Sequence, residues 1–175
     1  MQLKSNKIKL SLLDESDLPL FIEMSTCPQL MKHIYKPYTV EEAREAFYEK
    51  SKPWNFECDQ WLCFGIADIN TREKLGNIGL KVINLEQKVA EIGFMLKVSA
   101  HGKGIASEAL KLLINCAFCD VKINKLMAYC STDNIASYRL LEKLGFSREA
   151  YLKNNTTINN IPVDDYAYGL YTRVT

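Results

Sequence analysis

The residues with the clearest chemical potential lie in one glycine-rich stretch, His101-Gly102-Lys103-Gly104-Ile105-Ala106. This stretch follows an apolar, strand-like run over residues 90–98 and precedes an amphipathic, helix-like run over residues 104–119. A strand, a glycine turn and a helix in this order aim unpaired backbone N–H groups at an anion, and the helix dipole adds to the attraction. The pattern therefore predicts a site for a phosphate-bearing cofactor.

Three other interpretations of this stretch can be compared with that prediction. A dinucleotide-binding motif requires a third glycine, where this chain has Ser107, and an acidic residue about 20 positions later, where it has Lys, Ile and Asn at 122–124. A nucleoside-triphosphate loop requires Gly-Lys-Ser or Gly-Lys-Thr, which the sequence never contains. The third interpretation is a plain tight turn with a close strand–helix contact. The stretch alone leaves the cofactor site and the plain turn equally open.

Charge and composition narrow the class of protein. The chain has 175 residues, 47% of them hydrophobic, which suits a single domain with a full core. Its 22 Lys and Arg nearly balance 21 Asp and Glu, so we expect no direct nucleic-acid or membrane partner. The first ten residues contain no apolar stretch typical of a signal peptide, and the sequence has no run of about 18 apolar residues. A cytoplasmic location is the expectation.

Six cysteines raise the question of disulfides or a metal. In a chain expected in the cytoplasm, reduced thiols are favoured over a disulfide framework. Cys116 and Cys119 have C-x-x-C spacing, but no second Cys pair or His pair accompanies them, and the two histidines are His33 and His101. We therefore expect packed thiols and no metal.

The hydrophobic pattern predicts the elements that must position the glycine turn. Strand patterns at 61–69, 75–85 and 89–98 are separated by short polar turns, which predicts an antiparallel meander. The strand at 125–131 follows a whole helix, so we expect it to lie parallel to its neighbour through a right-handed crossover. The result is an α+β fold: one mostly antiparallel, mixed sheet of about seven strands, with about four helices on both faces. The remaining strands are expected at 8–13, 146–152 and 163–171, the helices from about residue 18 and at 40–50, 104–119 and 134–144, and a polar Asn-rich loop at 154–160.

Four features in a fixed order resemble one known family. They are the strand Ala90-Glu91-Ile92-Gly93-Phe94, the glycine turn, the motif Asn134-x-x-Ser137, and the run Glu142-Lys143-Leu144-Gly145-Phe146. Together they resemble the GNAT superfamily of N-acetyltransferases, and most closely its RimJ/RimL type, which acetylates the N-terminal amines of ribosomal proteins. The resemblance covers residues 10–171. It implies a GNAT-like fold, one acetyltransferase domain over residues 1–175, and acetyl-CoA as cosubstrate.

The resemblance also assigns residues to the cofactor. Family members carry Gln or Arg, two residues, Gly, one residue, then Gly or Ala; Gly104 and Ala106 match, whereas His101 departs from the pattern. The departure is mild because backbone amides bind the phosphates. The resemblance implies that these amides hold the pyrophosphate, and that the preceding strand pairs with the pantetheine arm where two parallel strands separate. The implied cofactor-binding residues are Leu96, Val98, His101, Gly102, Lys103, Gly104, Ile105, Ala106, Ser107 and Asn134, with Lys143 as a further aid to the phosphates.

Acetyl transfer to an amine requires a neutral amine, a stabilised oxyanion and a proton for the leaving thiolate. An N-terminal amine with a pKa of about 8 is partly neutral at pH 7, whereas a lysine, with a pKa of about 10.4, is not. Glu91 is the candidate base, directly or through water, although a solvated surface carboxylate remains an open interpretation. The Leu96 N–H is the candidate oxyanion donor.

The candidate acid is Ser137. Many superfamily members have a tyrosine at the position of Leu141, so that acid is absent here. The RimJ/RimL type instead has a serine three residues after the asparagine, which is Ser137. Tyr138 is adjacent but is expected to point about 100° away around the helix.

The leading interpretation is an acetyl-CoA-dependent N-acetyltransferase that acts on a protein N-terminal amine by direct transfer in a ternary complex. One alternative is a small-molecule acceptor, namely a polyamine, an amino acid or an aminoglycoside; Asp164 and Asp165 leave a polycation open. Another is a non-catalytic acyl-CoA-binding module, for which the missing tyrosine and His101 are the support. Both a monomer and a homodimer remain possible. Aromatic residues precede the meander where an acceptor groove could form, although packing explains them as well: Tyr35, Tyr38, Trp54, Phe56 and Trp61.

Overall fold

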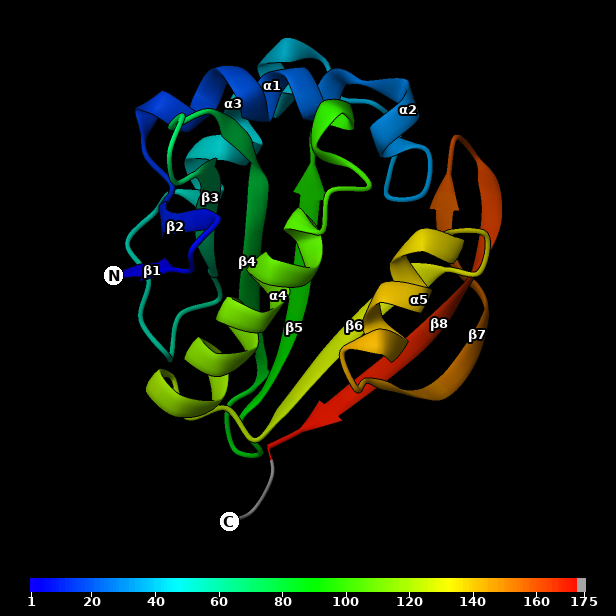
Figure 1. Cartoon of the computed structure of the whole chain (residues 1–175). Helices are drawn as coiled ribbons and strands as arrows, with labels where there is room; N and C mark the ends of the chain where they lie inside the picture. Colours follow the sequence, from blue (N-terminus) through cyan, green and yellow to red (C-terminus); the bar gives the residue numbers. More distant parts are fainter. Residues whose placement is uncertain (173–175) are drawn as a thin grey trace.

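The computed structural model describes residues 1–172, and one sheet of eight strands organises them (Figure 1). The strand order is β1-β2-β3-β4-β5-β6-β8-β7, and every neighbouring pair is antiparallel except β5 and β6. The strands are β1 Gln2–Lys4, β2 Ile8–Leu12, β3 Trp61–Asp68, β4 Lys74–Asn84, β5 Val89–Leu96, β6 Lys125–Ser131, β7 Ser147–Ile158 and β8 Ile161–Tyr171. The helices are α1 Leu18–Thr26, α2 Pro28–Met31, α3 Val40–Lys50, α4 Ile105–Asn115 and α5 Ile135–Lys143.

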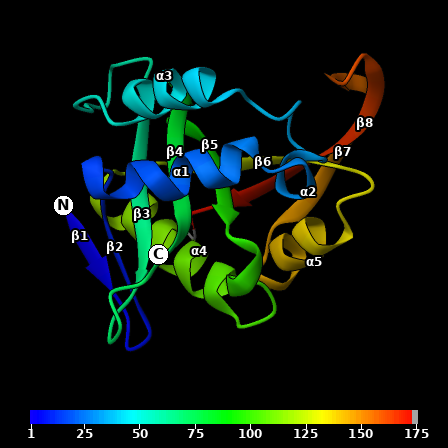
Figure 2. The same ribbon diagram turned by 90° about the horizontal axis from the view of Figure 1, so that it is seen from above.

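Helices cover both faces of the sheet. Seen from above, α3 lies on one side and α4 and α5 on the other, while α1 crosses in front of the strands (Figure 2). The larger core fills the α4 side, where Ala109, Leu110 and Leu113 pack against strand residues such as Ile92. A smaller cluster, which includes Phe21 of α1 and Phe47 of α3, fills the other side. The predicted α+β fold with a mixed, mostly antiparallel sheet is confirmed.

Capping motifs define two helix ends. Thr39 accepts a hydrogen bond from the Glu42 N–H at 3.1 Å, and Glu42 accepts one from the Thr39 N–H at 2.8 Å, which is a capping box at the start of α3. At the end of α5, Gly145 has a φ of 92°, and the Phe146 N–H donates to the Leu141 carbonyl at 3.1 Å. This is a Schellman-type stop.

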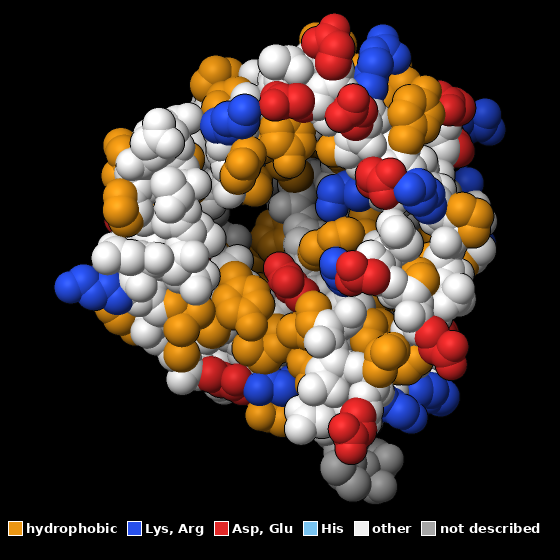
Figure 3. Space-filling view, turned by 180° about the vertical axis from the view of Figure 1, so that it is seen from behind, with side chains coloured by type: hydrophobic (Ala, Val, Ile, Leu, Met, Phe, Trp, Pro, Cys, Tyr) orange, Lys and Arg blue, Asp and Glu red, His pale blue; other side chains and the backbone are white. Residues whose placement is uncertain are grey.

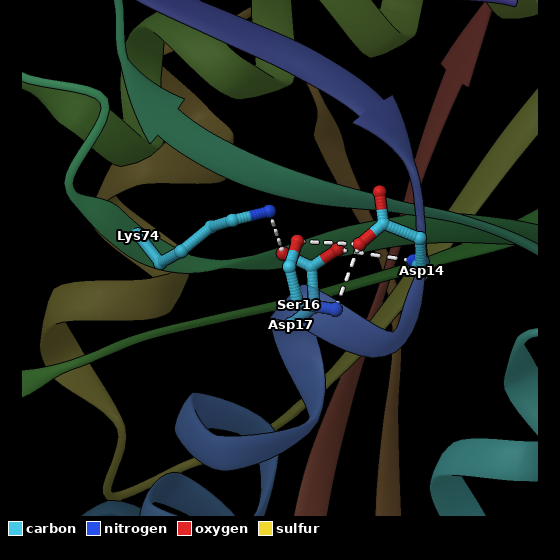
Figure 4. A network of polar contacts seen from close by, with 4 residues as sticks. All are labelled: Asp14, Ser16, Asp17 and Lys74. Atoms are coloured by element: carbon cyan, nitrogen blue, oxygen red, sulfur yellow. Dashed lines mark hydrogen bonds and ion pairs between the residues drawn. The ribbon is translucent and has the colours of Figure 1, made fainter.

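A polar network ties the start of α1 to the sheet (Figure 4). Asp14 accepts hydrogen bonds from the N–H and the hydroxyl of Ser16, while Asp17 accepts one from the Asp14 N–H at 3.1 Å. The carboxylate of Asp17 is buried and pairs with the Lys74 ammonium of β4 at 2.6 Å. Gly65 leaves room for it, since a Cβ there would lie 2.4 Å from Asp17 Oδ1.

Some expected boundaries were wrong. The strand β1 was not expected, and β5 ends at Leu96, so that Val98 begins a 3-10 turn, Val98–Ala100. The expected Asn-rich loop is mostly strand: β7 runs to Ile158, and the hairpin closes at Asn159 and Asn160. Short α2 was also not expected. Within residues 1–172, no helix has the length and apolarity needed to cross a membrane.

Candidate active site

The strands β5 and β6 are paired only at their beginnings. Three residue pairs join them, the last being Glu91 with Met127, after which the strands diverge. The Lys97 N–H donates to the Leu75 carbonyl of β4 at 2.9 Å, so the odd-numbered residues of β5 bond to β4. The N–H and C=O groups of Phe94 and Leu96 therefore face the gap. This is the separation of parallel strands that the sequence analysis expected.

A cavity of about 520 Å³ opens at this gap. It connects the end of β5, the glycine turn before α4, the first turns of α5 and the region around α2. It contains most of the predicted cofactor-binding residues together with Ser137. Its lining comprises Leu30, Ile34, Phe94, Met95, Leu96, Ala100, His101, Gly102, Gly104, Ile105, Ala106, Ser107, Asn134, Ala136, Ser137, Leu140 and Lys143.

The glycine turn forms an anion cradle at the edge of the cavity. Gly102 and Gly104 have φ values of 71° and 77°, which favour glycine, and a Cβ on either would meet nothing within 4 Å. The first hydrogen bond of α4 runs from the Glu108 N–H to the Gly104 carbonyl at 3.1 Å. Within residues 1–172, no protein acceptor pairs with the backbone N–H groups of residues 102–107. These unpaired donors fit a pyrophosphate.

Three predicted cofactor residues differ in their placement. The His101 ring Nε2 lies 3.0 Å from the Leu96 carbonyl at the end of β5, and the residue lines the cavity. Val98 and Lys103 are exposed and do not line the cavity. Their contact with a cofactor stays a prediction.

The first turn of α5 points its polar groups at the cavity. Asn134 caps the helix, because its side-chain oxygen accepts the Ser137 N–H at 3.2 Å. Both residues line the cavity. Tyr138 instead packs edge-on against Tyr166, with ring centroids 5.8 Å apart, and Leu141 is buried in the core. Ser137 is thus the hydroxyl that α5 presents to the cavity.

Glu91 lies outside the cavity lining, on the face of the sheet covered by α1 and α3. It belongs to a row of cross-strand neighbours: Trp61 of β3, Lys81 of β4, Glu91 of β5 and Met127 of β6. Met95, four residues after Glu91 and therefore on the same face, does line the cavity. Figure 3 shows this face hollowed near its middle, with hydrophobic side chains inside and acidic and basic side chains around the opening.

Burial sets the electrostatics of Glu91. Desolvation raises the pKa of its carboxyl, while Lys81 and Lys50 act in the opposite direction. A raised pKa makes a carboxylate a stronger base, provided that it remains deprotonated at working pH. Glu91 is therefore partly buried, and its role as the base stays a prediction.

Sequence reasoning missed the residues that tertiary structure alone brings to the site. Leu30 of α2 and Ile34 just after it line the cavity, as does Leu140 of α5. Lys50, at the end of α3, places its ammonium 4.3 Å from the ring centroid of Trp61. No pattern in the sequence of residues 28–34 indicated this wall, because Leu30 and Ile34 lie among polar residues.

The cysteines carry no sign of a metal site. All six are free thiols, and burial raises the pKa of the Cys116 thiol to about 11, which opposes the thiolate form that a metal requires. In the part of the chain that the structure describes, no group of three or more His, Cys, Asp or Glu side chains converges on a point.

Comparisons with known proteins agree on one family. The family model described as "Acetyltransferase (GNAT) domain" matches residues 7–147. The probable N-acetyltransferase YjcK of Bacillus subtilis is 33% identical over 125 residues, which cover 71% of this chain and 68% of that protein. The spermidine N(1)-acetyltransferase of Escherichia coli K12 is 28% identical over 156 residues, covering 89% and 81%. The chain spans 60 to 68% of the length of the first three curated relatives it matches.

Solved structures show the same fold. An acetyltransferase (GNAT family) from Bacillus anthracis superposes with a TM-score of 0.83 at 25% identity, with 98% of both chains covered. The spermidine N-acetyltransferase from Vibrio cholerae, in complex with CoA and spermine, gives a TM-score of 0.83 at 20% identity, with 95% of this chain and 96% of that one covered. At that identity the second likeness concerns the fold alone.

Proposed function

The chain belongs to the GNAT acetyltransferase family, and from this premise we propose that it is a single acetyltransferase domain that transfers an acetyl group from acetyl-CoA to a primary amine. The transfer is direct, within a ternary complex, without an acyl-enzyme. The observation that carries the proposal is the cavity that joins the amide cradle before α4 to Ser137 on α5, through the gap between β5 and β6.

Two sets of unpaired backbone groups bind acetyl-CoA, one in the glycine turn and one at the end of β5. The N–H groups of residues 102–107 hold the pyrophosphate, with Lys143 at the cavity edge adding positive charge. The N–H groups of Phe94 and Leu96 and the Phe94 carbonyl have no partner on β6, and the amide groups of the pantetheine arm pair with groups of this edge; the Leu96 carbonyl is already contacted by the His101 ring. Asn134 borders the same path.

Glu91 and the strand amides prepare the addition step. Glu91 accepts a proton from the amine through water, and a gap-facing N–H of β5 stabilises the oxyanion. The sequence placed that donor at Leu96, which lies five residues from Glu91, about 17 Å along the strand. The Phe94 N–H lies only three residues away, about 10 Å, and also lines the cavity. We therefore assign the oxyanion to Phe94 and the pantetheine contact to Leu96.

Ser137 completes the reaction as the acid. Its hydroxyl faces the cavity from the first turn of α5, where Asn134 fixes the backbone. Because a thiol has a pKa of about 8.5, protonating the departing thiolate is a modest demand that a hydroxyl can meet.

The acceptor we favour is the N-terminal α-amine of a protein, as in the RimJ/RimL type, because such an amine is partly neutral at pH 7 and places little demand on the base. A polyamine is the second candidate. Its support is the E. coli relative named as a spermidine N(1)-acetyltransferase.

Mass spectrometry of cell extract incubated with the protein and isotopically labelled acetyl-CoA tests the proposal. Label on protein N-termini is the expected result, whereas label on spermidine favours the second candidate. If CoA and acetyl-CoA fail to bind and no amine acquires label, the proposed function is wrong.

A further inference from the structure

A cluster of three polar side chains ties α5 to the sheet. Glu142 of α5 accepts a hydrogen bond from the Tyr168 hydroxyl of β8 at 2.7 Å and another from Arg148 Nη2 of β7 at 3.2 Å. Arg148 Nε also donates to the Tyr168 hydroxyl oxygen at 3.0 Å, which closes the triangle. Leu141 is the only fully buried residue among the nine of α5, so these polar contacts contribute to how the helix is held.

The geometry of the cluster is fixed from several directions. Tyr168 is fully buried, and burial together with the hydrogen bond to Glu142 raises the pKa of its hydroxyl to about 12, so it stays a donor at neutral pH. The guanidinium of Arg148 lies 3.7 Å from the ring centroid of Tyr166 and 5.6 Å from that of Tyr138 on α5.

Arg148 therefore reaches α5 at two positions, Tyr138 and Glu142, which are about one turn apart. An ion pair as exposed as this one, at 42% for Arg148 and 45% for Glu142, contributes little when it stands alone. Stacking on an aromatic ring and the shared hydrogen bonds place the planar guanidinium in one orientation. Two restraints on the same face of a helix oppose its rotation about its own axis.

Rotation of α5 matters because Ser137 directly precedes Tyr138 and lines the cavity. The helix packs on the part of the sheet formed by β6, β8 and β7, whereas α4, which follows the cradle, packs on β2 and β4 (Figure 1). Turning α5 by about 20° would move an atom about 5 Å from the axis by about 1.7 Å. A displacement of about 1 Å in a reacting group can lower a rate about 100-fold.

We propose that Arg148 is a positioning residue, which fixes the rotation of α5 and thereby directs the Ser137 hydroxyl towards the thiol of bound CoA. The inference rests on the proposed function, in which Ser137 is the acid. Arg148 does not line the cavity, so it acts through α5 and not by contact with either substrate. The cradle at residues 102–107 lies on the other part of the sheet and should bind CoA as before.

A double-mutant cycle with Arg148→Met and Ser137→Ala tests this inference. A peptide with a free N-terminal amine and spermidine serve as acceptors, at saturating acetyl-CoA. Arg148→Met should lower kcat about tenfold or more, with the Kd for CoA within about twofold of the wild type. In the Ser137→Ala background the same substitution should change kcat by less than about twofold, because the group that it positions is already gone. A merely structural role would lower kcat by the same factor in both backgrounds.

Two further variants separate geometry from charge. Arg148→Lys keeps the positive charge, but an ammonium cannot stack flat on Tyr166 while donating in two fixed directions, so it should recover only a small part of the lost rate. Tyr168→Phe keeps the ring in the core and removes the hydroxyl that both Glu142 and Arg148 contact. It should lower kcat in the same direction, again only where Ser137 is present, and it replaces Arg148→Met in the cycle if that variant does not fold.

Arg139→Met is the matched control, because Arg139 is exposed on the same helix and belongs to none of the ion pairs within residues 1–172. It should keep kcat within about twofold, and melting temperature verifies that each variant is folded. An unchanged kcat in Arg148→Met, equal losses with and without Ser137, or full recovery in Arg148→Lys would overturn the inference while acetyl transfer by the wild type stands. If the wild type transfers acetyl to no amine, the proposed function is wrong and the inference is wrong with it.

Discussion

Ser137 is the residue whose removal separates catalysis from binding. Its hydroxyl faces the cavity, but its N–H is engaged by Asn134, so the helix does not depend on the hydroxyl. We predict that Ser137→Ala lowers kcat by roughly 10- to 1000-fold, as for loss of one acid or site donor, with the Kd for CoA nearly unchanged.

The control is Ser107→Ala, which removes a second cavity-lining hydroxyl but keeps the N–H of the cradle. It should change neither kcat nor Kd by more than about twofold. Steady-state kinetics and calorimetric titration with CoA measure both. An unchanged kcat in Ser137→Ala would leave Ser137 a structural residue.

The role of Glu91 as a base can be tested through the pH dependence of kcat. A base works only when deprotonated, and burial raises the pKa of this carboxyl, so wild-type activity falls as the pH drops through that pKa. In Glu91→Gln we expect kcat to fall about 10- to 100-fold near pH 6.5. The deficit should shrink above about pH 8, where an α-amine is already neutral in water. A deficit of the same size from pH 6.5 to 9 would contradict the role as base.

At the scale of single residues, local motifs were predictable and contacts formed by register were not. The cradle of residues 102–107 and the cap at Asn134 depend on neighbours within a few positions, and the sequence contains those neighbours. Trp61, Lys81 and Glu91 form one cross-strand row only because β3, β4 and β5 pair in one register. That register is a property of the whole sheet, so no short pattern indicated it.

At the scale of the elements, the start of α1 is held by a residue that is distant in the sequence. Lys74 of β4 neutralises Asp17, whose side chain is 6% exposed, compared with 31% for Lys74. We predict that Lys74→Met lowers the free energy of unfolding by about 1–3 kcal/mol, because a buried carboxylate loses its counter-charge.

A surface pair supplies the comparison. Lys52 and Glu49 are 49% and 60% exposed, so Lys52→Met should cost less than about 1 kcal/mol. Urea denaturation measures both variants. Equal effects would mean that the ion pair shown in Figure 4 does not fix the start of α1.

Strand ends were harder to predict than strand existence. Asparagine is typical of turns, so residues 154–160 were expected to form a loop. In the structure, Asn154, Asn159 and Asn160 have positive φ, but the first lies at an irregularity between Leu152 and Thr156, and only the last two make the hairpin turn. Asparagine indicates a position where the backbone can adopt a positive φ. Such a position occurs in a bulge within a strand as well as in a loop, so the residue type alone does not distinguish the two.

For the whole molecule, the cradle predicts how stability responds to ligands. CoA at 100 times its Kd should raise the free energy of unfolding by about 2.7 kcal/mol, because it binds only the folded chain. In a chain of 175 residues this corresponds to a rise in Tm of roughly 5–10 °C.

Pantetheine at the same concentration lacks the pyrophosphate and should raise Tm by less than about 2 °C, because it cannot use the six free N–H groups of residues 102–107. Differential scanning fluorimetry distinguishes the two. Equal shifts would show that the amides before α4 are not the phosphate site.

The overall architecture could be predicted from the sequence. Meander, crossover and final hairpin follow from the order of strand and helix patterns, and these patterns are long enough to be distinct. Divergence of β5 from β6 was expected only through the resemblance to a family. Nothing in the composition of residues 92–96 indicates that one edge of the strand lacks a partner.

Only three residue pairs join β5 to β6 among the described residues, so the sheet consists of two parts that are connected at one end. The hydrogen bonds missing between the two parts are those that a ligand in the gap would restore, so the rigidity of the protein and its occupancy are thermodynamically linked. Amide hydrogen exchange at Phe94 and Leu96 would report this link directly. Among residues 1–172 no acceptor pairs with these two N–H groups, so they should gain protection when CoA binds.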